Sequence, residues 1–144
     1  NRALYKALQA AGTHLQNYGT VFATIADKDK EEVLPLIRRF YNLGFNIEAT
    51  IGTANFLKKN GIRTHVLKKL QEDSLEIEES IRQGHIAYII NTRDIGSEGE
   101  ENDGYKIRAL ATENNITIFT SLDTVRVLLD VLEETTLTIS TIDA

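Results

Sequence analysis

Cysteine, methionine and tryptophan are absent from the 144-residue sequence, and proline occurs once. Without cysteine the chain has no disulfide and no thiolate metal site, which is typical of a reducing compartment, and we expect a cytoplasmic protein. The histidines His14, His65 and His85 lack the spacing of metal ligands, so we expect no metal site. Because no initiator methionine is present, we expect a segment of a longer polypeptide.

Long apolar runs and an excess of positive charge are missing as well. No run approaches the roughly 20 apolar residues that a membrane-spanning helix needs, and no signal peptide is recognisable. The formal net charge of −5 argues against nonspecific binding of nucleic acid, because such surfaces use clustered cations to displace counterions. We therefore predict neither a membrane nor a nucleic acid as partner. The length of 144 residues predicts one domain, and the 42% apolar content is typical of a globular protein.

Segments with β propensity alternate with segments of helical periodicity along the chain. Strands are predicted at residues 20–25, 45–49, 65–67, 86–90 and 116–119, and helices at 2–11, 33–43, 52–60, 75–83, 105–114 and 121–132. Strands that alternate with helices need right-handed crossovers. The pattern predicts an α/β fold on a five-stranded parallel sheet.

Three further features are predicted between and after these elements. Asp27 or Asp29 is available to cap the helix that follows. The acidic, glycine-rich stretch Asn91–Gly104 is predicted to be a mobile loop, and Thr135–Ala144 a loosely specified tail.

Thr50-Ile51-Gly52-Thr53 lies where the second strand meets its helix. Free backbone N–H groups and the helix dipole favour an anion at such a position, which suggests a phosphate cradle. An ordinary strand-to-helix turn capped by Thr50 or Thr53 is the alternative.

The carboxyl ends of parallel strands meet at one edge of the sheet, so other polar residues should join this turn. The edge would be net basic and suited to a phosphorylated small molecule. Each side chain also has an ordinary alternative, as a solvated charge, a strand-end cap or a turn residue. The candidates are Thr24, Lys30, Thr50, Gly52, Thr53, Lys68, Asn91, Thr92, Arg93 and Thr120.

The chain resembles a known family in several segments. These are FATIADKDKEEVLPLIRRFYNLGFNIEATIGTANFLKKNGI, VLKKL, IAYIINT and the D-x-x-x-I-R run that ends at Arg108. Together they are similar to the C-terminal allosteric domain of the carbamoyl phosphate synthetase large subunit, which is methylglyoxal-synthase-like. By this resemblance residues 1–19 would connect to a preceding synthetase domain, and residues 20–144 would form the allosteric domain, a three-layer α/β/α sandwich.

The resemblance implies a regulatory domain that binds a nucleoside monophosphate, UMP or IMP, and carries no catalytic residue and no cofactor of its own. Its phosphate and ribose contacts would fall on Thr24, Lys30, Thr50, Gly52, Thr53, Lys68, Asn91 and Thr92, with Arg93, Arg108 and Thr120 as further candidates. The parent enzyme would be an ATP-dependent, glutamine-hydrolysing ligase that uses Mg²⁺ or Mn²⁺. Its other parts, the remaining synthetase domains and a glutaminase small subunit, would be partners in pyrimidine and arginine biosynthesis.

Methylglyoxal synthase, which acts on dihydroxyacetone phosphate, is the alternative with the same architecture. Such enzymes carry a G-G-D run after the third strand, whereas this chain has KKLQED at residues 68–73. The missing glycines favour the regulatory interpretation. A pure docking domain is a third interpretation, but no segment adds apolar surface beyond what the core needs.

Overall fold

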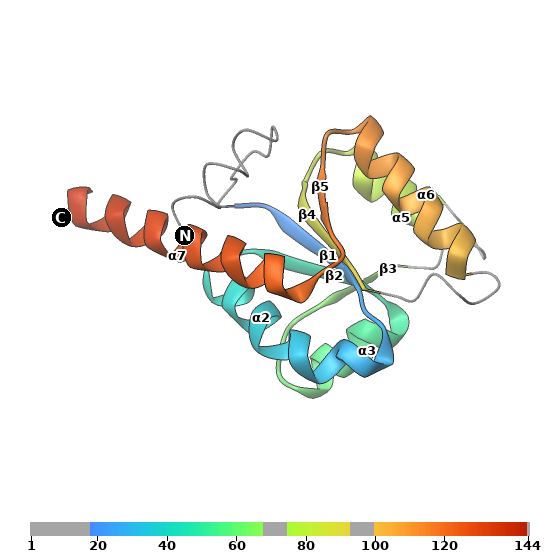
Figure 1. Ribbon diagram of the computed structural model, residues 1–144, viewed down its shortest axis with the longest axis horizontal. Coiled ribbons are helices and arrows are strands. Elements are labelled where there is room, and N and C mark those ends of the chain that lie inside the picture. The colour runs from blue at the N-terminus through green and yellow to red at the C-terminus, as the bar shows by residue number, and fades with distance from the viewer. Residues whose placement is uncertain (1–17, 68–74, 93–99, 144) are drawn as a thin grey trace.

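The computed structural model describes residues 18–67, 75–92 and 100–143, and five parallel strands form its central sheet (Figure 1). The spatial order is β3-β2-β1-β4-β5, and every adjacent pair is parallel. The strands are β1 (Thr20–Thr24), β2 (Asn46–Thr50), β3 (His65–Leu67), β4 (Ile86–Asn91) and β5 (Thr117–Phe119). The predicted parallel sheet is confirmed, with strand ends displaced by one residue or less.

Helices cover both faces of the sheet. They are the short 3₁₀ helix η1 (Asp27–Asp29) and the α-helices α2 (Lys30–Asn42), α3 (Ile51–Lys59), α5 (Leu75–Arg82), α6 (Glu100–Glu113) and α7 (Leu122–Asp143). Figure 1 shows α2, α3 and α7 on one side of the sheet and α5 and α6 on the other. The arrangement is the predicted three-layer α/β/α sandwich.

The alternation of side chains along the strands divides the core in two. Val21 and Ala23 of β1 face the layer of α2, α3 and α7, whereas Phe22 faces α5 and α6. On the first side Phe40 and Phe45 meet edge to face, with ring centroids 5.4 Å apart, and both contact Tyr88 of β4. These buried aromatic rings join α2 to the centre of the sheet.

Two helices end in the way that the glycines of the sequence predict. Gly44 after α2 and Gly61 after α3 have positive φ angles of 100° and 85°. Beyond each glycine the chain turns back, so that Phe45 N–H donates to the Phe40 carbonyl and Ile62 N–H donates to the Leu57 carbonyl. This is the Schellman arrangement, in which a left-handed residue lets the last carbonyls of a helix be satisfied. It sends the chain directly into β2 and toward β3.

An ion-pair network holds α2 against α7. The Arg39 guanidinium donates to Asp130 at 2.7 Å and, through Nε, to Glu133 at 3.2 Å. Hydrogen bonding to Glu133 is the main cause that raises the pKa of Arg39 above its already high ordinary value. The pairs are partly exposed, so they orient α7 more than they stabilise the fold.

Several boundary predictions were wrong. Helix α6 begins at Glu100, so the last residues of the predicted Asn91–Gly104 loop are helical, and α7 continues through the predicted tail to Asp143. Asp29 occupies the N-cap position of α2 but makes no side-chain capping bond. The predicted helix at residues 2–11 lies outside the described residues. No helix within the described ranges has the length and apolar character for a membrane span.

Candidate functional site

The site is built from the carboxyl ends of the three central strands. Thr24, Thr50 and Asn91 are the last residues of β1, β2 and β4, and all three are buried. Thr24 and Asn91 are partners in the β1–β4 register. Polar groups that are buried side by side at this edge need hydrogen-bond partners, which makes their contacts informative about the site.

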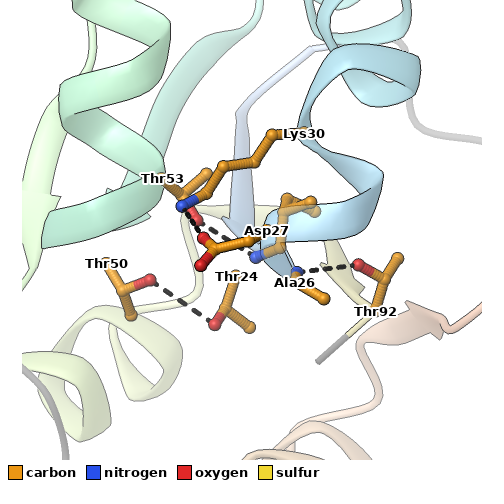
Figure 2. Close-up of polar contacts among 8 residues, drawn as sticks. Thr24, Ala26, Asp27, Lys30, Thr50, Thr53 and Thr92 are labelled. Carbon is orange, nitrogen blue, oxygen red and sulfur yellow. Dashed lines mark hydrogen bonds and ion pairs between the residues drawn. The ribbon is translucent and has the colours of Figure 1, made fainter. Parts of the chain in front are cut away.

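Four hydroxyls, those of Thr24, Thr50, Thr53 and Thr92, form what we call the threonine cluster (Figure 2). Thr53 Oγ1 accepts a hydrogen bond from the Ile25 N–H, and Thr92 Oγ1 accepts one from the Ala26 N–H, each at 3.1 Å. Thr50 Oγ1 donates to Thr24 Oγ1 over 3.4 Å. Thr53 and Thr92 thus accept hydrogen bonds from consecutive backbone N–H groups just after β1.

These bonds leave Thr53 and Thr92 able to act as donors. A hydroxyl has two acceptor positions and one O–H, and in both residues the contact to the β1 exit uses an acceptor position. The oxygen is held in place while its proton is still available to a neighbouring anion. Thr50 occupies the N-cap position of α3, but its side chain makes no capping hydrogen bond to that helix. The alternative of a turn capped by Thr50 is therefore wrong.

The amino terminus of α3 adds backbone donors beside the threonine cluster. The first N–H groups of a helix have no partner within the helix, and they lie at the positive end of its dipole. Gly52 stands in this first turn, and a Cβ built there would lie 3.6 Å from Nζ of Lys30. A lysine ammonium is therefore held directly over the first turn of α3.

Lys30, the first residue of α2, places a positive charge at this site. Its Nζ forms an ion pair with the Asp27 carboxylate, as Figure 2 shows. The Lys30 side chain is 18% exposed, whereas that of Asp27 is 94% exposed. A carboxylate so fully in water holds its partner weakly, so a more strongly bound anion could share or replace it.

A polar hollow of about 360 Å³ lies beside the threonine cluster, and sequence reasoning missed most of its lining. Thr120, a predicted candidate, is in this lining, and Thr92 is common to both features. The other lining residues are Lys28, Asp29, Glu32, Ser121, Leu122 and Asp123. Within the described chain this part of the edge carries three carboxylates and one ammonium, so the prediction of a net basic edge does not hold here. The polar turn before α2 signalled Lys28 and Asp29 as polar residues, but not as part of a site.

The three remaining predicted candidates are Lys68, Arg93 and Arg108. Lys68 and Arg93 lie outside the described residues. Arg108 lies within α6 and is partly exposed, eight residues after the helix begins, which corresponds to about 12 Å along its axis. No set of three or more metal-ligating side chains comes together in the ranges that the structure describes.

The fold and the position of the threonine cluster define an α/β domain with a polar cluster at the carboxyl edge, where open parallel sheets bind their ligands. Within that class the chain belongs to the MGS-like domain family, whose model matches residues 32–120, more than half of the sequence.

Two solved structures share the fold. A crystal structure of methylglyoxal synthase from Elizabethkingia anophelis NUHP1 is 18% identical, with a TM-score of 0.62 and 78% of each chain covered. A crystal structure of ForH is 17% identical, with a TM-score of 0.51, and the match covers 81% of this chain and 80% of that chain. At these identities the likeness shows the fold alone.

Proposed function

We propose that this chain is the regulatory domain of a glutamine-hydrolysing carbamoyl phosphate synthetase large subunit and binds a nucleoside monophosphate, UMP or IMP. The observation that supports the proposal is the convergence of the threonine cluster, the amino terminus of α3 and the Lys30 ammonium at one point of the carboxyl edge. Membership of the MGS-like domain family is compatible with this role.

The phosphate of the nucleotide would lie against the first turn of α3. The O–H groups of Thr53 and Thr92 and the backbone N–H groups of that turn would donate to its oxygens, with Lys30 as a point charge. The buried Thr24 and Asn91 would contact the ribose side of the ligand, and Lys68 would supply a second cation.

Regulation requires that the effector binds two states of the parent enzyme with different affinities. Typical coupling free energies of about 1–3 kcal/mol correspond to changes of several-fold to a hundredfold. In this proposal ATP and Mg²⁺ or Mn²⁺ bind to the synthetase domains, which, with the glutaminase small subunit, are the partners. The setting would be cytoplasmic pyrimidine and arginine biosynthesis.

Calorimetric titration of the 144-residue chain with UMP and IMP tests the proposal. We expect Lys30→Ala to weaken nucleotide binding about tenfold, because it removes the Lys30 ammonium from the proposed phosphate site. Lys59→Ala, at the exposed far end of α3, is the matched control and should leave the affinity unchanged. Equal weakening by both substitutions would show a general charge effect and would contradict this site.

Methylglyoxal synthase activity is the second candidate function, because the Asp27 carboxylate lies beside the same proposed phosphate site. Such a reaction needs a carboxylate to move protons next to the carbonyl of dihydroxyacetone phosphate. Incubation with dihydroxyacetone phosphate and an assay for methylglyoxal separates the two functions. Product formation that Asp27→Asn abolishes would establish the enzyme, whereas UMP binding without turnover supports the regulatory domain.

A further inference from the structure

Asp27 makes an ion pair that its own exposure does not require. Its side chain is 94% exposed and could be fully hydrated, yet its carboxylate turns back to the Lys30 ammonium (Figure 2). The geometry of η1 explains this contact, because residues three positions apart lie in line along a 3₁₀ helix, and Asp27 begins η1 while Lys30 follows it. The sequence D-K-D-K thus places a negative charge beside an ammonium that lies over the first turn of α3.

The backbone just before Asp27 is held in place. The two preceding N–H groups, those of Ile25 and Ala26, donate to the hydroxyls of Thr53 and Thr92, each at 3.1 Å. These bonds keep Asp27 next to the threonine cluster. Because the carboxylate is so exposed, a rotation of the Asp27 side chain is enough to move it from the ammonium into water.

The Asp27 carboxylate lies where the electrostatics of α3 favour an anion. Acidic side chains are stabilising in the first turn of a helix, but α3 has none in its own first turn. A Cβ built at Gly52 would lie 3.6 Å from Lys30 Nζ, and the Asp27 carboxylate pairs with this same Nζ. A nucleotide phosphate at the proposed site would need the same ammonium, so the two anions would compete for Lys30.

We propose that Asp27 is an internal competitor of the effector, an autoinhibitory contact that lowers the affinity of the proposed site for phosphate groups. Binding of a phosphate breaks the ion pair of Asp27 with Lys30, and the Asp27 carboxylate turns into solvent. Because the competitor and the site belong to the same chain, the competition does not depend on protein concentration. It raises the effector concentration at which the domain responds by a constant factor. This inference rests on the proposed nucleotide site and adds how the affinity of that site is set.

Titration of the 144-residue chain with inorganic phosphate and with UMP, for the wild type and for Asp27→Asn, tests the competition. Asparagine keeps the shape of the side chain and removes its charge. A partly exposed ion pair contributes little, so we expect Asp27→Asn to bind each ligand about threefold to fivefold more tightly. The gain should be the same for both ligands, because the competitor acts on the phosphate group that they share. Glu31→Gln, which removes an exposed carboxylate from the first turn of α2, is the control and should leave both affinities nearly unchanged.

NMR spectra of the wild type follow the ion pair directly. Added phosphate should move the carboxyl carbon signal of Asp27 together with the amide signal of Gly52. A Gly52 shift without an Asp27 shift would overturn the proposal, as would phosphate affinity that is unchanged or weaker in Asp27→Asn. An equal gain in Glu31→Gln, or a gain of Asp27→Asn that is as large in a Lys30→Ala background, would show general repulsion instead of competition for Lys30 and would also overturn it.

The internal competitor and the nucleotide site fail in different ways. Tighter phosphate binding by Asp27→Asn, without UMP binding to either protein, would support the competitor and contradict UMP as the effector. UMP binding that Asp27→Asn leaves unchanged would support the nucleotide site and contradict the competitor. The absence of phosphate binding by both proteins would contradict both.

Discussion

Replacing Thr53 by valine separates the two roles that the structure gives to this hydroxyl. Thr53 is 2% exposed, and its Oγ1 accepts the N–H of Ile25, which is itself buried. Valine has nearly the same shape but no acceptor, so the Ile25 N–H is left without this partner. Leaving a buried N–H unsatisfied costs about 1–3 kcal/mol. For a domain of this size that lowers the melting temperature by roughly 2–4 °C per kcal/mol.

The same substitution should also weaken nucleotide binding. Valine removes one O–H donor from the proposed phosphate site, and we expect UMP affinity to fall about tenfold. In urea denaturation at a UMP concentration of about 100 times the wild-type dissociation constant, the wild type should gain about 2.7 kcal/mol and the variant about half of that. Thr53→Ser, which keeps the hydroxyl and loses the methyl group, is the control and should retain most of the affinity.

Two results would refute this reasoning. Unchanged stability of Thr53→Val would mean that the bond to Ile25 contributes nothing to the fold. Reduced stability with unchanged UMP affinity would mean that Thr53 only supports the β1 exit and does not reach the ligand.

Three further predictions concern the same elements. Gly52→Ala places a Cβ 3.6 Å from Lys30 Nζ, which is ordinary contact, so thermal melting should show equal or higher stability, by up to about 1 kcal/mol, while UMP titration shows weaker binding. Arg39→Met should lower the unfolding free energy by about 1 kcal/mol in low salt and by less in high salt, whereas the more exposed Arg126→Met should change it less. Phe40→Ala should cost about 3–5 kcal/mol in urea denaturation, because Phe40 is fully buried among aromatic rings; a loss below about 1 kcal/mol would contradict the packing described above.

The candidate site could be predicted in part. The threonines at the ends of β1, β2 and β4 were found because a parallel sheet brings these ends to one edge, which needs only the strand assignments. The hollow around Thr120 was not predicted, and neither was the contact of the largely buried Glu48 with His85. Glu48 occupies a polar position in an alternating strand pattern, and such a position predicts exposure to solvent rather than burial beside His85.

By itself the sequence determined the order of strands and helices, the parallel sheet and the helix ends at Gly44 and Gly61. These depend on side-chain periodicity and on backbone freedom within a few neighbouring residues. Only the tertiary structure decided where the hydroxyls donate and accept, because the bonds of the threonine cluster join residues 28 and 66 positions apart. Such contacts depend on the distance between packed strands, and no local pattern in the chain encodes that distance.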